Sequence, residues 1–102
     1  MSVPQTTIVP AHSAVNVNGD TLALAANAMR VYALFVNDSN SPIYLSLGAA
    51  AVTNQGIRLN ANGGSYEISH AFGNWYQGEV RANHGGVGNM LLLVTEGVLW
   101  GH

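Results

Sequence analysis

The chain has 102 residues, of which only 8% are charged and 48% are hydrophobic, whereas an ordinary soluble domain has about 25% charged residues. Its cations are three scattered arginines, and there is no lysine. Nucleic acids and anionic membranes both require clustered cations, so neither is an expected partner. The longest apolar run, Met90–Val94, is far shorter than the 18 or so residues of a membrane-spanning helix.

The shortage of charge has a second implication, which concerns the surface of the folded chain. A small domain has much surface for its volume, and a monomer normally covers that surface with charged side chains. Here Asn, Ser, Thr, Gly and Ala take their place. We therefore expect a single domain over residues 1–102 whose surface is largely covered by neighbours in an assembly. The absence of cysteine excludes disulfides and thiolate metal sites.

The first quarter of the chain predicts short strands. Thr6–Val9 is expected to form a strand that Pro10 closes, which makes residues 1–10 a possible N-terminal arm. Asn18-Gly19-Asp20 lies between the apolar runs Ala14–Val17 and Thr21–Ala25, and Asn-Gly at such a place indicates a hairpin.

Two features of the next segments leave alternatives open. Leu22–Met29 is rich in Ala and Leu and is also compatible with a helical turn. Arg30–Val36 is apolar on both faces of a strand, so it is either buried on both sides or covered by a neighbouring subunit. The turn Asn37–Pro42 then leads to Ile43–Leu47, and we expect these two strands to pair as a hairpin.

The second half of the chain continues the same pattern. Gly56–Leu59 and Ser65–Ser69 alternate cleanly and predict a hairpin, with Ile57, Leu59, Tyr66 and Ile68 pointing inward. Further strands are expected at Tyr76–Ala82 and at Met90–Thr95, the latter again apolar on both faces. Residues 97–102 form an apolar C-terminal tail.

About eight short strands with frequent turns predict an all-β fold, namely a single-domain antiparallel β-sandwich, jelly roll or barrel. No internal repeat, heptad or linker interrupts this organisation.

No set of residues predicts catalysis or a bound cofactor. The histidines His12, His70, His84 and His102 are widely spaced, and we interpret them as solvated residues of loops and the terminus. The symmetry axis of a trimer can bring three copies of one histidine together, and the sequence leaves such a metal site open. The carboxylates show no paired spacing, and there is no nucleophile motif. We expect a protein that is not an enzyme and needs no cofactor.

Apolar and aromatic residues are the best candidates for contact with a partner. Large aromatic side chains at strand ends either close the core or anchor an interface. A Trp-Tyr pair in a loop is also compatible with stacking on a sugar. The N-terminal arm is a candidate because its strand can add to the edge of a neighbour's sheet. The expected contact residues are Val3, Ile8, Val9, Phe72, Trp75, Tyr76, Leu99 and Trp100.

Four stretches resemble a family of small structural proteins of tailed phages. They are Ala25-Ala26-Asn27-Ala28-Met29-Arg30, Val36-Asn37-Asp38-Ser39, Ile43-Tyr44-Leu45-Ser46-Leu47-Gly48 and Gly63-Gly64-Ser65-Tyr66-Glu67-Ile68. Their order and spacing are similar over roughly residues 20 to 96. Ala28 stands where that family usually has proline.

The resemblance implies a component of a virion, such as a capsid decoration (cement) protein, a head-fibre base or a tail accessory protein. We expect a homo-oligomer, in the form of a trimer, on the exterior of a capsid, with the major capsid protein as its partner. A carbohydrate- or receptor-binding module on a phage tail or fibre is the alternative expectation.

Overall fold

The computed structural model describes residues 7–69 and 73–100, which form eight β-strands and no helix. Side chains are described from Ile8 to Leu99 within these ranges. In chain order the strands are β1 (Thr7–Val17), β2 (Thr21–Leu24), β3 (Arg30–Asn37), β4 (Ile43–Leu47), β5 (Ile57–Leu59), β6 (Ser65–Ser69), β7 (Val80–His84) and β8 (Met90–Trp100).

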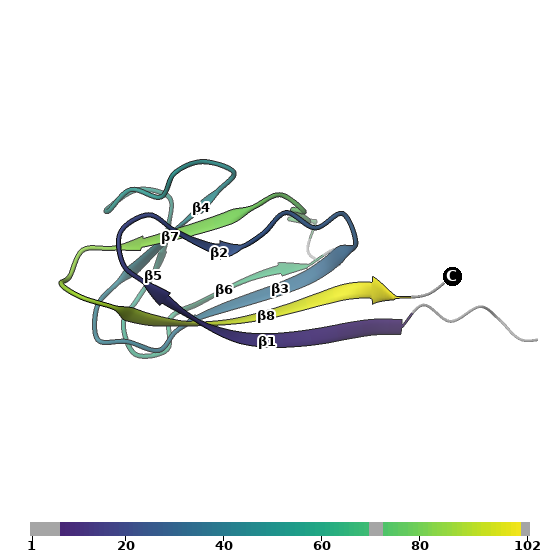
Figure 1. Ribbon diagram of the computed structural model, residues 1–102, viewed down its shortest axis with the longest axis horizontal. Coiled ribbons are helices and arrows are strands. Elements are labelled where there is room, and N and C mark those ends of the chain that lie inside the picture. Colours follow the sequence, from purple (N-terminus) through teal and green to yellow (C-terminus); the bar gives the residue numbers. More distant parts are fainter. Residues whose placement is uncertain (1–6, 70–72, 101–102) are drawn as a thin grey trace, which may run out of the picture.

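The strands form two four-stranded antiparallel sheets, with the order β1-β8-β3-β6 in sheet A and β2-β7-β4-β5 in sheet B. The two sheets lie one above the other (Figure 1). Within them β1 pairs with β8, β2 with β7, β3 with β6 and β4 with β5. This nested pairing is the strand order of a jelly roll, in which a long antiparallel hairpin is folded over on itself. The prediction of an all-β antiparallel sandwich is confirmed.

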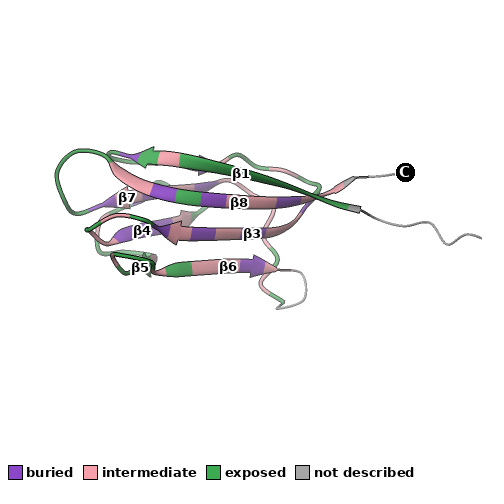
Figure 2. Ribbon diagram, turned by 90° about the horizontal axis from the view of Figure 1, so that it is seen from below, coloured by how far each residue is buried: buried purple, intermediate pink, exposed green. Residues whose placement is uncertain are grey.

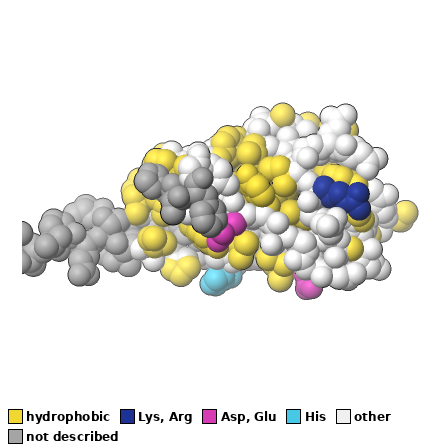
Figure 3. All heavy atoms as spheres, turned by 180° about the vertical axis from the view of Figure 1, so that it is seen from behind, with side chains coloured by type: hydrophobic (Ala, Val, Ile, Leu, Met, Phe, Trp, Pro, Cys, Tyr) yellow, Lys and Arg dark blue, Asp and Glu magenta, His cyan; other side chains and the backbone are white. Residues whose placement is uncertain are grey.

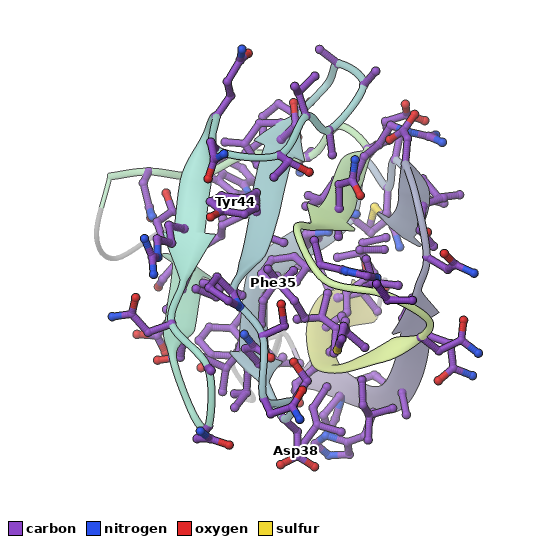
Figure 4. All side chains as sticks on the ribbon, turned by 90° about the vertical axis from the view of Figure 1, so that its left-hand side faces the viewer. Phe35, Asp38 and Tyr44 are labelled. Atoms are coloured by element: carbon purple, nitrogen blue, oxygen red, sulfur yellow. The ribbon has the colours of Figure 1, made fainter. Side chains whose placement is uncertain are left out.

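The core lies between the two sheets and is built from alternate residues of each strand. Phe35, Ile43, Leu45, Ile68 and Leu92 have no exposed surface. Seen from the end of the sandwich, Phe35 lies inside the ribbon whereas Asp38 points away from it (Figure 4). Burial of each such side chain contributes about 1.5–3 kcal/mol. The predicted inward orientation of the β5 and β6 residues is confirmed, because Leu59 and Ile68 are buried and Ile57 and Tyr66 pack against the same cluster.

Each of the three predicted hairpins is wrong, because in each case the two strands belong to different sheets. The turn at 18–20 carries the chain from sheet A to sheet B, and so does the turn at 38–42. Residues 60–64 carry it from sheet B back to sheet A. Only β4 and β5 are consecutive strands that pair with each other.

The turn Asn18-Gly19-Asp20 shows why the local pattern misled. A type I′ hairpin turn needs positive φ at both central residues. Only Gly19 has positive φ, at 71°, and Asn18 does not. The Thr21 hydroxyl accepts a hydrogen bond from the Asn18 amide (3.1 Å) and donates to its carbonyl (3.2 Å), which stabilises a wider bend. An Asn-Gly turn is therefore as compatible with a connection between two sheets as with a hairpin.

The first and the last strand of the chain are longer than expected. Strand β1 runs through Pro10 without interruption, so the predicted strand end at Pro10 is wrong. Strand β8 continues from the expected Met90–Thr95 to Trp100, so the described part of the C-terminal tail is strand. In contrast, β7 begins at Val80 and not at Tyr76. Leu22–Met29 contains no helical turn. Of the alternative, a strand at Thr21–Ala25, residues Thr21–Leu24 form β2.

Candidate contact surface

The outward side of sheet A is apolar and open. Because opposed residues of an antiparallel pair share a face, the register places Ala14, Leu93 and Val36 in one row and His12, Thr95 and Leu34 in the next. We call this side the open face. Its apolar residues are Ile8, Ala14, Tyr32, Leu34, Val36, Leu91, Leu93 and Leu99.

Exposure confirms that no part of the described chain covers the open face. Along β3, buried residues alternate with half-buried ones, and on β8 Leu93 is 39% exposed. Figure 2 looks onto this face and shows exposed and intermediate residues along β1 and β8. The strands that are apolar on both sides are therefore buried on one side only. Their second apolar side, which the sequence placed either in a core or under a neighbouring subunit, faces outward.

Gly97 brings two side chains of the open face together. A Cβ atom at this position would lie 2.9 Å from Cγ2 of Ile8 and 3.2 Å from Cβ of Tyr32. Tyr32 donates a hydrogen bond from its hydroxyl to the Glu67 carboxylate. That bond, together with partial burial, raises the pKa of the Tyr32 phenol above its usual 10.0. Its contribution to stability is therefore present below pH 10 and is lost only as the pH rises through the higher folded-state pKa.

Strands β1 and β8 extend beyond the rest of the sandwich as a two-stranded ribbon (Figure 1). Neighbouring residues of β1 point to opposite faces, yet Ile8 is 54% and Val9 is 40% exposed. The ribbon thus exposes apolar side chains on both of its faces. The expected contact residues Ile8, Val9 and Leu99 lie together here, with Ile8 directly opposite Leu99.

The segment Gly73–Glu79 lies beside the base of the ribbon and contains two further expected contact residues. Trp75 is 45% exposed, and its indole Nε1–H donates to the Arg30 carbonyl (2.6 Å). Tyr76 is half-buried and packs against the core, with its hydroxyl donating to the Glu79 carbonyl (3.2 Å). Of this pair, only Trp75 is largely exposed. Val3 and Phe72 lie outside the described residues, and of Trp100 only the backbone is described.

A fully buried arginine fixes this end of the molecule. The Arg30 guanidinium donates from Nε to Glu96 (2.8 Å) and from Nη1 to the carbonyls of Tyr76 (3.2 Å) and Gly78 (2.8 Å). Its Nη2 donates to the Ala25 carbonyl. One side chain therefore ties the loop after β2 and the segment before β7 to strand β8. The sequence identified Arg30 only as a scattered cation, and no local pattern signals its role.

The other sheet has a cover of its own. The loop from Gly48 to Gly56 lies against sheet B, and Ala51 within it is 4% exposed. Asp20 accepts hydrogen bonds from the Ala51 amide (3.0 Å) and from Arg81 Nε (2.9 Å). Asn83 donates to the Ala51 carbonyl (3.1 Å). The outward face of sheet B is therefore partly covered from within the chain, in contrast to the open face.

The Asp20 contacts predict a pH response of this loop. The Arg81 and Ala51 hydrogen bonds lower the pKa of the Asp20 carboxyl below its usual 3.8. A lowered folded-state pKa means that the stabilisation is present above pH 3.8 and is lost as the pH falls through the folded-state value. We expect the Ala51 amide proton shift in NMR spectra to titrate with a midpoint below pH 3.8. The Asp20→Asn variant should abolish that titration; a midpoint at or above 3.8 would contradict the assignment.

The structure brings no catalytic or metal-binding set together in the part of the chain it describes. Among these residues no three His, Cys, Asp or Glu side chains group as metal ligands. His12 lies in β1 and bonds Thr95 (2.9 Å), while His84 is 7% exposed. His12 is exposed, as expected, but lies in a strand and not in a loop. His84 is the last residue of β7 and is buried, so the expectation of a solvated loop residue is wrong for it. His70 and His102 lie outside the described residues.

His84 and Asn37 are both used within the fold. His84 Nδ1 accepts from the Gly86 amide (3.0 Å), and Nε2 lies 2.7 Å from the Gly88 carbonyl. The Asn37 side chain, in an Asn-Asp-Ser sequence typical of glycosylation, is fully buried and donates to the carbonyls of Ser41 (2.8 Å) and Leu59 (3.0 Å). In the folded chain its amide is therefore inaccessible to a sugar.

Charged side chains are rare on the surface as a whole. On the face seen in Figure 3, they appear as isolated spots among apolar and uncharged polar atoms. No helix in residues 7–69 and 73–100 has the length and hydrophobicity to span a membrane. Comparison with known proteins finds no matching family model, no matching curated protein and no matching solved structure. The argument about function therefore rests on the fold and on the surface of this chain.

Proposed function

We propose that the protein is a non-enzymatic structural component of a virion that decorates the exterior of a phage capsid. It acts as a cement protein, bridging adjacent subunits of the major capsid protein as a homo-oligomer, with a trimer as the expected form. Because it binds the assembled shell and not separated subunits, binding stabilises the shell by mass action. At a concentration 100 times the dissociation constant, this contributes about 2.7 kcal/mol per site.

The open face is the observation that carries the proposal. A monomer in solution rarely exposes a large contiguous apolar patch, and such patches typically mark interfaces. Here Leu93 and Ile8 are exposed on one side of a sheet that has few charges around it. Aliphatic and small polar surfaces of this kind suit a permanent contact with another protein better than transient electrostatic binding.

The fold gives weaker support. Jelly rolls of eight strands recur in viral capsid proteins and in lectins, so the strand order agrees with a virion component. Fold analogy alone does not establish function, since one fold serves many. The jelly-roll strand order is, however, consistent with the resemblance of residues 20 to 96 to structural proteins of tailed phages.

The test measures binding to undecorated capsids. We expect the purified protein to co-sediment with shells from a panel of tailed phages and to raise the melting temperature of the shell that it fits. Leu93→Lys should abolish co-sedimentation, because it places a charge in the open face. Val87→Lys is the matched control, since Val87 is 94% exposed in the turn before β8 and lies off that face.

Both variants should unfold within about 0.5 kcal/mol of the original protein, as surface substitutions usually do. A protein that sediments apart from every shell in the panel, and leaves each melting temperature unchanged, overturns the proposal.

Trp75 favours one alternative function, a carbohydrate- or receptor-binding module of a phage tail or fibre. Its indole is 45% exposed, and the bond from Nε1 to the Arg30 carbonyl fixes the position of the ring. A fixed, exposed aromatic ring is a platform on which a sugar can stack. Binding on a glycan array that Trp75→Ala abolishes, combined with no binding to shells, would select this alternative.

A further inference from the structure

The four sheet edges of the sandwich differ in how they are protected. Open edges pair readily with other chains, so proteins shorten, charge, bend or cover them. In sheet B the edge strands β2 and β5 have only four and three residues. In sheet A the edge strand β6 has five residues, and the Asn74 side chain bonds the Ser69 amide (3.0 Å) and the Glu67 carbonyl (2.8 Å) along its edge. Strand β1, with 11 residues, is the long edge.

Strand β1 lacks most of the usual protective devices. No charged residue occurs before Asp20 in the sequence. The pairing of β1 with β8 runs from Thr7 to Val17 without a bulge that would bend the edge away. Residues from Ile8 to Ala14 are all exposed, and Figure 2 shows no other described strand lying along this edge. The one protective residue is Pro10.

Two hydrogen bonds of β8 show which backbone groups of β1 face outward. The Leu91 carbonyl accepts from Asp38, and the Leu99 amide donates to Met29, so odd-numbered residues of β8 face β3. Even-numbered residues of β8 therefore face β1, where the register pairs them with odd-numbered residues. It follows that Ile8, His12, Ala14 and Asn16 direct their amides and carbonyls to the open edge. The nitrogen of Pro10 faces the same way.

This placement explains why Pro10 does not break β1, and it defines the pairable part of the edge. The missing donor of Pro10 costs the β1–β8 ladder nothing, because it faces away from β8. It does interrupt the outer ladder. The backbone groups of His12, Ala14 and Asn16 thus form the uninterrupted outward run. Ser13, which lies between His12 and Ala14, has a small side chain.

We propose that this edge pairs with the same edge of a second copy of the chain, antiparallel about a two-fold axis at Ala14. In this register His12 lies opposite Asn16 of the second copy, and both Pro10 residues fall outside the paired run. An isologous contact sets a segment against itself, so a charge near the axis would meet its own equivalent. The uncharged run 12–16 avoids that repulsion.

The pairing joins the two copies of sheet A into one eight-stranded sheet and makes their open faces continuous. The inference does not depend on the proposed function, since it concerns self-association in the absence of a shell. A two-fold contact by itself closes a dimer, and in combination with the three-fold contact of the expected trimer it joins two trimers into a hexamer.

The experiment is sedimentation equilibrium of the full chain and of variants at Ala14. We expect the original protein to associate through this edge, as a dimer or, where the three-fold contact of the expected trimer also forms, as a hexamer. Ala14→Pro removes an outward donor while leaving the β8 ladder intact, as Pro10 does, and should weaken association about tenfold or more through the loss of two hydrogen bonds. Ala14→Lys and Ala14→Glu should each weaken it as well, because like charges then meet at the axis.

An equimolar mixture of Ala14→Lys with Ala14→Glu should restore the dimer, because opposite charges then face each other across the axis. Ala50→Lys, in the exposed loop over sheet B, is the matched control and should leave the dimer unchanged. Circular dichroism verifies that each variant is folded.

A monomer at every concentration overturns the inference, and so does an oligomer that is indifferent to the changes at Ala14. A chain that stays monomeric alone but associates with a different protein through this edge would mean that the edge receives a foreign strand, and this outcome also overturns the inference. Shell binding by a monomeric Ala14→Pro variant would retain the proposed function while separating it from self-association.

Discussion

Replacing Arg30 by alanine should lower the free energy of unfolding by about 3–5 kcal/mol, the usual effect of removing one partner of a buried ion pair. Glu96, whose side chain is 17% exposed, would keep its charge without its cation. The carbonyls of Ala25, Tyr76 and Gly78 would lose their donors in a site too tight for full hydration. For a domain whose total stability is of the order of 5–15 kcal/mol, this is a large fraction. Urea unfolding measures it directly.

Two further arginine variants make this measurement specific. Arg30→Lys keeps the charge but loses the planar guanidinium that reaches several acceptors at once. Its free energy of unfolding should therefore lie between those of the original protein and of Arg30→Ala. Arg58→Ala removes an exposed arginine from β5 and should change stability by less than about 0.5 kcal/mol. An Arg30→Ala protein as stable as Arg58→Ala would show that the buried network contributes little.

Replacing Phe35 by alanine should cost about 3–5 kcal/mol, since it leaves a cavity in the middle of the core. Phe35 has no exposed surface and lies between Val94 of β8 and Tyr66 of β6 in the register of sheet A. The surrounding strands are fixed on both sides by ladder hydrogen bonds, so they close the cavity only in part. Thermal and urea unfolding should agree on the loss.

The adjacent residue on β3 gives the matched control for Phe35. Leu34 belongs to the open face and is half-buried, so Leu34→Ala should cost clearly less than Phe35→Ala. A loss at Leu34 equal to that at Phe35 would mean that the open face is covered in solution. In that case the loss at Leu34 should also grow smaller as the protein is diluted and its assembly dissociates.

The strands themselves could be predicted from the sequence where alternation was clean. Ile43–Leu47 and Ser65–Ser69 have the bounds that the pattern predicted. Partners could not be predicted, because a turn such as Asn18-Gly19-Asp20 satisfies a hairpin and a crossing between sheets equally well. The choice depends on β8, which lies far along the chain and competes for the same edge of β1.

The candidate surface was predictable only in outline. The apolar character of Arg30–Val36 on both faces signalled a covered surface, and the structure shows which of those faces is open. The strand-breaking effect expected of Pro10 failed because the direction of its nitrogen depends on the pairing, which no local pattern contains. The role of Arg30 was hidden for the same reason, since its acceptors include Glu96 and Tyr76, which lie far along the chain.

The nested strand pairing also constrains how the chain folds. Only the β4–β5 contact is local, and each further pair encloses the previous one. The outermost pair, β1 with β8, includes the contact of His12 with Thr95 across 83 positions and extends to Thr7 opposite Trp100. Such distant contacts place folding in the range of milliseconds to seconds. Strand β8 lies in the middle of sheet A, so during synthesis β1 and β3 lack their shared neighbour until the last of the eight strands has emerged from the ribosome. Until then the uncharged β1 is exposed along both of its edges, which makes this interval the period of greatest risk for aggregation.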